Sequence, residues 1–234
     1  MKLSVIIPVF NEKNTVLEIV KRVLAVPLDK EVVIVDDGST DGTSEILKSP
    51  QMRQLVDQSG CEGIKIVFQK QNQGKGAAIK RGLEEVTGDA VVIQDADLEY
   101  DPMDFLALIK PIEEGRADVV YGSRILGHNR KSSFSFHYGG KLLTFVTNFL
   151  YRTHITDQPT CYKMFRTEVL NEFELSSRSF EFCSEVTAKL AKRGHRIMEL
   201  PIRYVPRSIR EGKKIRWKDG LIAIWTLIKY RFTG

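Results

Sequence analysis

The sequence predicts an α/β fold with a mostly parallel sheet and helices on both of its faces. Two observations carry this prediction. Apolar runs of strand length alternate with segments of helical periodicity through about the first 125 residues, which is typical of parallel sheets. The strand-like runs are also apolar with little interruption, as strands covered on both faces are. With 234 residues, 42% of them hydrophobic, the chain can bury a sizeable core.

The first part of the chain supplies strands and helices in turn. A proline ends the first apolar run, Asp41 is placed to cap the helix after the second, and Gly74-Lys75-Gly76 leads into the helix after the third. The expected strands are 2–8, 31–35, 64–68, 90–94 and 119–122. The expected helices are 15–26, one opening at Asp41, 75–86 and one after Pro102.

Beyond about residue 125 the pattern loosens, and we expect a C-terminal elaboration with amphipathic helices. The expected elements are a helix at 141–151, a strand at 160–165, a helix at 180–193, a strand at 197–205 and a helix at 218–232. The last helix carries one apolar stripe, made of Leu221, Trp225, Ile228 and Phe232. No repeat or low-complexity linker divides the chain, so residues 1–234 are expected to form a single domain.

The charge of the chain is modest but unevenly spread. The net charge is +5, and a dense basic stretch lies between residues 203 and 218. Such a stretch is usually a solvated face, but it can also hold phosphate or an anionic membrane surface. The three cysteines and four histidines show no metal-binding spacing, and with no signal peptide they favour a reducing, cytosolic setting. No uncharged apolar run approaches the roughly 18–20 residues of a membrane-spanning helix.

The most informative motif is acidic and follows the apolar run that ends at residue 93. Asp95, Asp97 and Glu99 would meet at the carboxyl end of that strand, which is where ligands bind in open α/β sheets. Crowded carboxylates repel one another unless a cation joins them. Oxygen ligands select Mg²⁺ or Mn²⁺, which typically shares its shell with substrate phosphates. The alternative is an acidic, solvated loop with a helix cap.

Four further polar loops are expected to follow strands of the same sheet. They are 8–12, 36–43, 72–78 and 122–124. Each alone is ordinary turn or helix-cap chemistry. Together they would line one sheet edge with carboxylates and glycines, which describes a nucleotide pocket. It is not a dinucleotide-binding fingerprint, because no Gly-x-Gly-x-x-Gly follows the first strand, and Gly74-Lys75-Gly76 lacks the other residues of a P-loop.

Taken together and in this order, these motifs resemble the GT-A family 2 glycosyltransferases. The likeness rests on Pro8-Val-Phe-Asn-Glu12, Asp36-Asp37-Gly38-Ser39, Gly74-Lys75-Gly76 and Asp95-Ala96-Asp97-Leu98-Glu99. Within this family, the chain is similar to dolichol-phosphate mannose synthases and related polyprenyl-phosphate glycosyltransferases. Phe180-Glu181-Phe182, Glu185 and the stretch 207–213 continue the likeness, so it covers nearly the whole chain. It implies a GT-A fold, with a nucleotide-sugar half at about 1–124 and an acceptor or membrane-facing half at about 125–234.

The likeness also assigns roles to individual residues. The residues that would bind the nucleotide sugar are Pro8, Phe10, Glu12, Val35, Asp37, Lys75, Asp95, Ala96, Asp97, Glu181, Arg207 and Lys213. Asp97, Glu99 and Asp95 would hold Mg²⁺ or Mn²⁺. Asp97 and Arg124 would be catalytic, Arg124 by holding the acceptor phosphate. Arg207 and Lys213 would bind the donor diphosphate from a mobile loop.

Three positions depart from the pattern of the family. Phe10 stands where many relatives have Tyr, Glu99 where mannose synthases often have Gln, and Glu181 where some have Lys. The departure at Glu181 leaves GDP-mannose and UDP-glucose both open as donors.

The reaction that the likeness implies is metal-dependent, inverting transfer of a hexose from a nucleotide sugar to dolichyl or undecaprenyl phosphate. A phosphate monoester is already anionic near pH 7, because its second pKa is about 6, so it needs little help from a general base. Alignment and electrostatic stabilisation of the departing diphosphate would then carry the catalysis. Three alternatives are a family 2 transferase acting on a soluble or cell-surface glycan, a nucleotidyltransferase that releases pyrophosphate, and a non-catalytic nucleotide-binding module.

A polyprenyl phosphate keeps its tail in the bilayer, so such an enzyme works at a membrane surface. Without a spanning run, we expect peripheral attachment on the cytoplasmic face, and we expect no nucleic-acid partner. The two apolar helices at 142–151 and 221–232 are flanked by basic residues, as interfacial helices are. Alternatively, each helix packs on the sheet or in a dimer. The sequence leaves the oligomeric state open.

Overall fold

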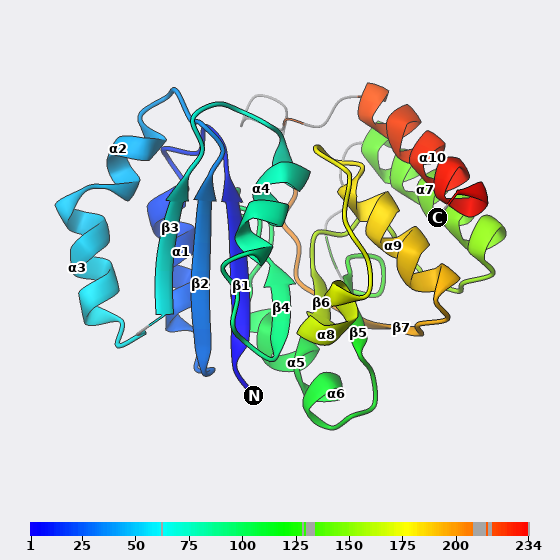
Figure 1. Cartoon of the computed structure of the whole chain (residues 1–234), viewed down its shortest axis with the longest axis horizontal. Coiled ribbons are helices and arrows are strands. Elements are labelled where there is room, and N and C mark those ends of the chain that lie inside the picture. Colours follow the sequence, from blue (N-terminus) through cyan, green and yellow to red (C-terminus); the bar gives the residue numbers. More distant parts are fainter. Residues whose placement is uncertain (62, 128, 130–133, 208–213, 215–216, 234) are drawn as a thin grey trace.

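In the computed structural model, both halves of the chain contribute strands to one sheet (Figure 1). The structure describes residues 1–61, 63–127, 129, 134–207, 214 and 217–233, with the side chains of 134–136 left aside. Within these residues the sheet has seven strands, in the order β3-β2-β1-β4-β6-β5-β7. The strands are β1 Leu3–Val9, β2 Lys30–Asp36, β3 Gly63–Phe68, β4 Ala90–Ile93, β5 Val119–Ser123, β6 Lys163–Arg166 and β7 Ile197–Pro201.

The sheet is mostly parallel, as predicted. β1 pairs in parallel with β2 and β4, β2 with β3, and β5 with β7. β6 is the exception, since it runs antiparallel to β4 on one side and to β5 on the other. Every residue of β1 and of β4 is buried, which fits strands covered on both faces.

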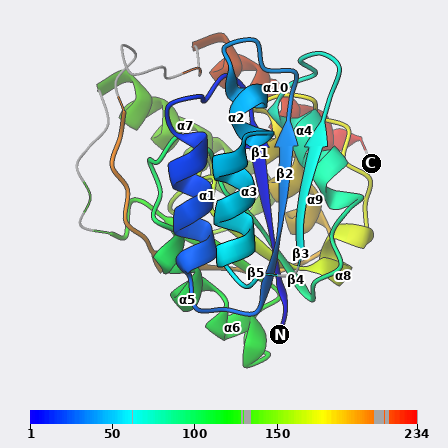
Figure 2. The ribbon, with the colours of Figure 1, turned by 90° about the vertical axis from the view of Figure 1, so that its left-hand side faces the viewer.

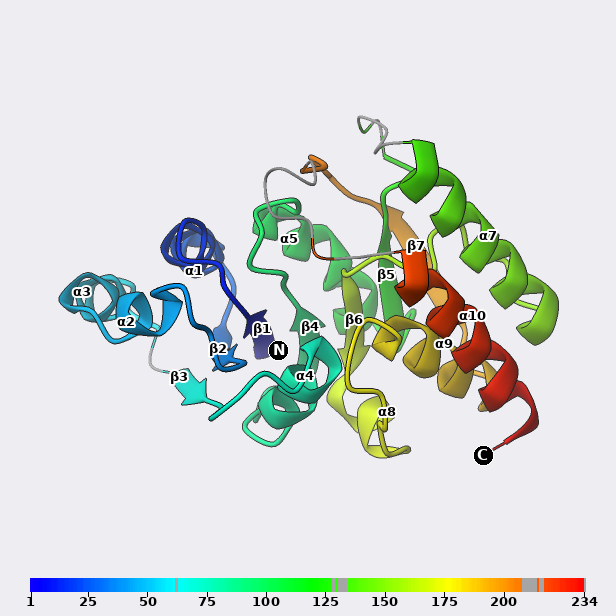
Figure 3. The same cartoon turned by 90° about the horizontal axis from the view of Figure 1, so that it is seen from above.

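The helices form layers on the two faces of the sheet. They are α1 Val16–Ala25, α2 Thr43–Leu47, α3 Pro50–Gln58, α4 Lys75–Leu83, α5 Phe105–Leu108, α6 Lys110–Glu113, α7 Phe134–Tyr151, α8 Thr167–Asn171, α9 Phe182–Lys192 and α10 Trp217–Phe232, with a 3₁₀ turn η1 at Pro102–Asp104. Seen from above, α1 and α5 lie on one face and α4, α8 and α9 on the other (Figure 3). Figure 2 looks onto the side that α1 and α3 cover.

α7 and α10 form an additional layer outside α9. They pack on each other and on α9, through a small apolar cluster that includes Ala188, Leu227 and Tyr230. Tyr151 adds a hydrogen bond, since its hydroxyl donates to the carbonyl oxygen of Leu227 at 2.6 Å. Within the described part of the chain, no helix combines the length and the apolar character needed to cross a bilayer.

Some predicted boundaries were wrong. The expected helix at 75–86 ends at Leu83, and the one expected after Pro102 is broken into η1, α5 and α6. Pro111 lies in the first turn of α6 and has no N–H to continue the preceding helix, which accounts for that break. Asp41 is not the N-cap of α2, which is Gly42, although Asp41 does accept the N–H of Thr43 at 3.0 Å.

Other elements were missed or shifted. α3 begins after Ser49, whose hydroxyl accepts the N–H of Met52 at 3.2 Å, and Pro50 occupies its first turn. α8 was also not expected. α7 begins at Phe134 rather than at 141, the strand expected at 160–165 is limited to Lys163–Arg166, and the strand expected at 197–205 ends at Pro201.

Candidate functional site

The loops after β1, β2, β3 and β4 meet at the upper edge of the sheet in Figure 1. Parallel strands place their carboxyl ends, and the loops that follow, at the same edge. Pro8 and Val35 are buried neighbours in the paired strands β1 and β2, and Ala96 is buried beyond β4. These residues give the edge an apolar floor, and the charged side chains around it pair in a defined pattern.

Lys75, the first residue of α4, forms an ion pair with Asp95. Its Nζ lies 2.5 Å from Oδ1 of Asp95 and 3.8 Å from Sγ of the buried Cys161. Burial alone would lower the pKa of the Lys75 ammonium, but Asp95 raises that pKa well above its ordinary value. Burial likewise opposes ionisation of Asp95, yet Lys75 lowers the pKa of that carboxyl. Both groups are therefore charged near pH 7.

Asp97 lies in a crowded, negative environment. Its burial, followed by the carboxylates of Asp95 and Glu99, raises its pKa to about 7. Oδ1 of Asp97 accepts the N–H of Glu99 at 3.1 Å, and Nη2 of Arg207 lies 3.5 Å from Oδ2. Leu98 between the two acids has a positive φ of 61°, a conformation that is uncommon outside glycine. A cation beside Asp97 would relieve the repulsion between these carboxylates.

Glu99 holds the segment that follows β7. Its Oε2 accepts from the hydroxyl of Tyr204 at 2.9 Å, and its Oε1 accepts from the backbone N–H of Arg207 at 2.8 Å. Tyr204 also forms an isolated bridge with Tyr100. The structure thus places Glu99 beside Asp97, with both of its oxygens in contact with the segment that carries Arg207. Its role as a metal ligand stays a prediction.

Arg207 and Lys214 converge on Glu12. Nη2 and Nη1 of Arg207 donate to Oε1 and Oε2 of Glu12 at 2.9 and 3.2 Å, and Nζ of Lys214 donates to Oε1 at 2.7 Å. Lys214 also donates to the carbonyl oxygens of Phe10 and Asn11, and lies 5.7 Å from the centre of the Phe10 ring. Nε of Arg207 is buried and has no partner among the described residues.

The basic stretch in the sequence indicated this region, but it did not distinguish Lys214 from its neighbours. Lys213, which the resemblance assigned to the diphosphate, lies outside the described residues.

Asp37 shapes the loop that precedes α4. Its two carboxylate oxygens accept the backbone N–H groups of Gln73 and Gly74, each at 2.8 Å. Burial raises the pKa of Asp37, and these hydrogen bonds oppose the rise. Gly74 has a φ of 99°, and a Cβ there would lie 2.3 Å from the carbonyl oxygen of Arg178, so glycine is required. Asp37 therefore helps to fix the position of Lys75.

Arg124 is paired with Asp157, a residue that the sequence did not single out. Nε and Nη2 of Arg124 donate to the two carboxylate oxygens at 2.8 and 2.7 Å, and its backbone N–H adds a third bond at 2.8 Å. Burial opposes ionisation of Asp157, but Arg124 lowers the pKa of that carboxyl. The guanidinium also lies 5.2 Å from the centre of the Tyr204 ring. With 23% of its side chain exposed, Arg124 can still meet an anion.

Glu181 forms hydrogen bonds within its own turn. Its Oε1 accepts the backbone N–H groups of Arg178 and Ser179 at 3.0 and 3.1 Å, which fixes the turn before α9. The structure does not bring Glu181 into contact with Asp97, and its role toward a nucleotide sugar stays a prediction.

The described part of the chain contains no group of three His, Cys, Asp or Glu side chains placed to hold a metal ion by themselves. Glu99 and Asp95 each have a strong protein partner, whereas Asp97 is mainly surrounded by other acids. The donor set therefore fits a hard divalent cation that takes one or two carboxylates and completes its shell with phosphate oxygens and water.

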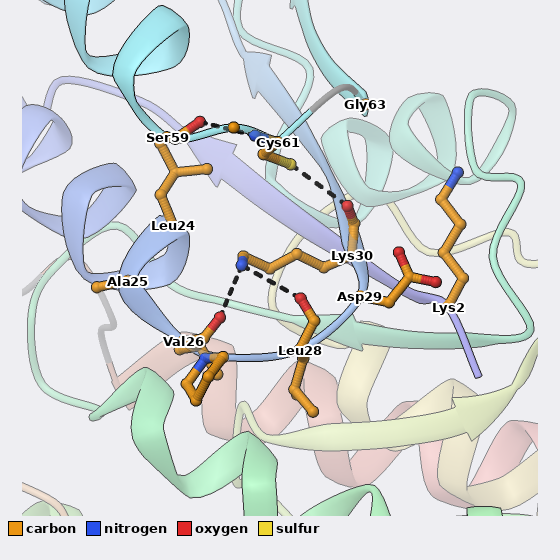
Figure 4. A pocket seen from close by; sticks show the side chains of 12 residues that line it. Lys2, Leu24, Ala25, Val26, Leu28, Asp29, Lys30, Ser59, Cys61 and Gly63 are labelled. Atoms are coloured by element: carbon orange, nitrogen blue, oxygen red, sulfur yellow. Dashed lines mark hydrogen bonds between the residues drawn. The ribbon is translucent and has the colours of Figure 1, made fainter.

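A hollow of about 640 Å³ lies at the opposite edge of the sheet, near the amino end of β2 (Figure 4). There Nζ of Lys30 donates to the carbonyl oxygens of Val26 and Leu28 at 2.7 and 3.4 Å, and Sγ of Cys61 donates to the carbonyl of Lys30 at 3.3 Å. These polar groups are satisfied by the fold. The described residues that line this hollow include none of the predicted site residues.

Comparison with known proteins identifies the family of the chain. The sequence profile of Glycosyl transferase family 2 matches residues 4–173. The low-salt glycan biosynthesis hexosyltransferase Agl6 of Haloferax volcanii is 30% identical over 212 residues, which cover 88% of this chain and 48% of Agl6. The dolichol-phosphate mannosyltransferase of Pyrococcus furiosus is 29% identical over 221 residues, covering 91% of this chain and 59% of that protein.

A third relative, the dodecaprenyl-phosphate galacturonate synthase of Rhizobium johnstonii, is 28% identical over 190 residues, covering 78% of this chain and 53% of that protein. The chain thus spans about half the length of the curated relatives it matches.

Solved structures establish the fold. Glucosyl-3-phosphoglycerate synthase from Mycobacterium tuberculosis, in complex with Mn²⁺, UDP and phosphoglyceric acid, has a TM-score of 0.71 at 19% identity, covering 100% of this chain and 79% of that chain. The same enzyme in complex with Mg²⁺ and UDP has a TM-score of 0.70, also at 19% identity, covering 98% of this chain and 79% of that chain. The likeness confirms the predicted GT-A fold. Because the family profile matches most of its length, the chain belongs to glycosyl transferase family 2.

Proposed function

We propose that this protein transfers a hexose from a nucleotide sugar, GDP-mannose or UDP-glucose, to a polyprenyl phosphate at a membrane surface. One observation carries the proposal: Asp97, crowded by other carboxylates, lies 3.5 Å from the Arg207 guanidinium at the carboxyl edge of the sheet. A carboxylate that favours a nearby cation and a guanidinium that favours an anion together suit a metal-bound diphosphate.

The relatives support the lipid acceptor. Two of them are named for transfer to dolichol phosphate and for synthesis of dodecaprenyl-phosphate galacturonate. Because this chain spans about half of their length, the acceptor is inferred from the shared part alone.

The donor would occupy the space above Phe10, Asp97 and Arg207. Phe10 would offer a flat face for the base, and Lys214, which lies over the Phe10 ring in the structure, would move aside on binding. The buried Nε of Arg207, which has no described partner, is a ready donor for a phosphate oxygen. Binding would therefore transfer Arg207 from Glu12 to the diphosphate, with Lys213 as a second proposed cation. This exchange replaces one charge-assisted contact of Arg207 with another, and Lys214 remains as a partner of Glu12.

Mg²⁺ or Mn²⁺ would be held by Asp97 with help from Asp95, and Glu99 lies beside them. When bound, the ion would neutralise charge that develops on the departing diphosphate. Lys75 keeps Asp95 ionised, so that the carboxylate remains available at neutral pH. Arg207 would add a second positive charge on the diphosphate.

The acceptor phosphate would approach from the side of Arg124. It is largely ionised near pH 7, because the second pKa of a phosphate monoester is about 6, so the protein has to align it more than to deprotonate it. Asp157 fixes the guanidinium of Arg124 in one orientation, and its exposed edge would meet the phosphate. Direct displacement by this phosphate inverts the anomeric centre.

The outer faces of α7 and α10 would rest on the membrane, peripherally and on the cytoplasmic side. Large exposed apolar side chains on these helices are Tyr138, Leu142, Phe145, Phe149, Trp217, Leu221, Ile222, Trp225, Ile228 and Phe232. Lys141, Lys218 and Lys229 lie on the same two helices. Aromatic and aliphatic side chains beside basic residues are typical of helices that bind an anionic lipid surface.

The test is a transfer assay with the full chain. GDP-mannose and UDP-glucose are each incubated with polyprenyl phosphate in liposomes, with Mn²⁺ or with excess chelator, and products are identified by mass spectrometry. We expect one glycolipid product that disappears on chelation and returns with added Mn²⁺ or Mg²⁺. A parallel reaction contains a water-soluble glycan in place of the lipid, and transfer to that glycan alone would overturn the lipid acceptor. Release of pyrophosphate would indicate a nucleotidyltransferase, and nucleotide binding without turnover would indicate a binding module.

A further inference from the structure

The carboxylate of Glu185, in α9, is fully buried away from the charges around Asp97. Its Oε1 accepts from the N–H of Ser176 at 2.8 Å, from Nζ of Lys189 at 2.5 Å and from the hydroxyl of Tyr230 at 2.9 Å. Its Oε2 accepts from the N–H of Ser177 at 2.6 Å. Burial opposes ionisation, but these hydrogen bonds lower the pKa of Glu185 to about 2. A charged Glu185 therefore joins α9, α10 and the turn at 176–179.

The turn at 176–179 packs directly against the start of α4, where Lys75 lies. The carbonyl oxygen of Arg178 accepts the N–H of Ala77 at 3.0 Å. A Cβ on Gly74 would lie 2.3 Å from that oxygen, and a Cβ on Gly76 would lie 2.5 Å from the carbonyl oxygen of Ser177. The two backbones therefore touch without an intervening side chain. A contact this close leaves no room for the turn to shift without moving the start of α4.

We infer that Glu185 is a positioning residue for the start of α4, residues 74–77, which is proposed to bind the donor, and that the hydroxyl of Tyr230 extends this control to α10. The inference rests on the proposed function, which places Lys75 and Asp95 in the donor site. Glu185 acts through the 176–179 turn, since it contacts neither Lys75 nor Asp95. The path is short: from the α10 phenol to the Glu185 carboxylate, to the turn and then to the residues on either side of Lys75.

This arrangement makes donor binding depend on the outer helical layer. Tyr230 belongs to the helix whose opposite face is proposed to rest on lipid, and it reaches inward to Glu185. Lys189 also helps to hold Glu185 and Tyr230 together. Its Nζ donates to the carbonyl oxygen of Glu174 at 2.5 Å and lies 4.5 Å from the centre of the Tyr230 ring. A displacement of the Tyr230 hydroxyl would thus be felt at Gly74 and Gly76 through Glu185 and the turn.

The test compares three variants of the full chain. Tyr230→Phe removes only the hydroxyl that meets Glu185, and Glu185→Gln removes the charge while keeping the size of the side chain. Tyr151→Phe is the matched control, because it removes a hydroxyl that donates to Leu227 in the same helical layer and does not involve Glu185. Each variant is measured for the kinetic constants of donor and acceptor, and for hydrogen exchange of the Ala77 amide.

We expect the KM for the donor to rise about 3-fold in Tyr230→Phe and about 10-fold in Glu185→Gln, because small displacements of binding groups can cost up to about 100-fold. The KM for the acceptor should stay unchanged. Exchange of the Ala77 amide should be faster in both variants and unchanged in Tyr151→Phe. A general loss of stability would not produce this selectivity for the donor.

Unchanged exchange at Ala77, or faster exchange with a normal KM for the donor, would overturn the inference. If Glu185→Gln does not fold, Tyr230→Phe decides by the same two measurements. Failure of the proposed function looks different: the unmodified protein would bind neither UDP nor GDP with Mn²⁺ and would transfer no sugar. The exchange of Ala77 in the variants would then still show whether Glu185 holds the start of α4.

Discussion

Glu31 and Asp97 are carboxylates at opposite edges of the same sheet, and their surroundings change their pKa values in opposite directions. Glu31, near the amino end of β2, accepts from the hydroxyls of Ser4 and Thr87, each at 2.6 Å, and lies 3.0 Å from Nζ of Lys2. Burial opposes its ionisation, yet these contacts lower its pKa to about 2. Burial and neighbouring acids instead raise the pKa of Asp97 to about 7.

The difference separates a carboxylate that serves the fold from one that is proposed to serve a ligand. The donors that Glu31 needs are supplied by the chain itself, so its charge stabilises the native state. The surroundings of Asp97 are mostly repulsive, and the charge it would carry at neutral pH favours a bound cation. A strongly perturbed acid in the loop region of an α/β sheet is typical of a functional site.

The largest expected effect is on catalysis at Asp97. Asp97→Asn should lower kcat/KM for sugar transfer by about 1,000-fold or more, because the divalent ion would lose the carboxylate proposed as its main protein ligand. The folded protein should be no less stable, since the change removes repulsion among the acids. Thermal unfolding and transfer rates are measured together. A variant that unfolds more easily but transfers normally would reverse the distinction between Asp97 and Glu31.

The next largest effect is expected at Arg207, whose guanidinium lies beside Asp97. Arg207→Met should weaken binding of the nucleoside diphosphate with Mn²⁺ by about 10- to 50-fold, because a charge-assisted phosphate contact is lost. Isothermal titration calorimetry gives the dissociation constants. Arg203→Met is the control, since Arg203 lies on the same segment but pairs with Asp101 and Asp104. Equal losses in the two variants would mean that the segment acts only through its general positive charge.

Substitution of Glu31 should change the stability of the protein and leave its activity unchanged. Glu31→Gln is expected to lower the free energy of unfolding by about 2 kcal/mol at pH 7, because buried hydrogen bonds to a charged group are lost, while kcat/KM stays unchanged. The stability that Glu31 contributes is present above its unfolded pKa of about 4.5 and is lost as the pH falls toward about 2. Denaturant unfolding of both proteins should therefore converge over that range. A gap that stays constant from pH 7 to pH 2.5 would contradict the assigned pKa.

The smallest effect tests whether α7 binds a membrane surface. Phe145→Glu and Phe149→Glu should each reduce co-sedimentation with anionic liposomes about 3- to 10-fold, because an aromatic side chain leaves the interface and a negative charge enters it. Phe68→Glu is the control, as an exposed aromatic residue at the end of β3. Binding should also weaken at high salt. Undiminished binding of both variants would move the membrane contact away from α7.

The fold could be predicted to a large extent because its signals are local. Uninterrupted apolar runs marked the strands, and helical periodicity marked α1, α9 and α10. The direction of β6 could not be predicted, because an apolar run has the same pattern whichever way its strand points. The broken helices after Pro102 depend on Pro111, whose missing N–H is a signal that the sequence itself carries.

The candidate site likewise has a part that could be predicted from the sequence and a part that could not. Residues that follow strands could be predicted, since parallel strands end at one edge. The pairs of Arg124 with Asp157, Glu12 with Lys214 and Glu99 with Tyr204 could not, because each joins segments far apart in the chain. These pairs also decide which of the predicted residues are still available for a ligand. Asp37 and Glu181 accept backbone amides in the structure, and their expected contact with the nucleotide sugar stays a prediction.

The reversed strand β6 has a consequence for synthesis of the protein. It lies between β4 and β5 although it follows both in the chain, and β5 has β6 and β7 as its neighbours in the sheet. A nascent chain that has emerged only as far as residue 124 would carry all the polar loops that follow β1 to β5 and still have an open edge at β4. Unpaired strand edges of this kind associate with other chains and recruit chaperones. Arrival of residues 163–166 at the ribosome exit would therefore be the step that first protects the sheet.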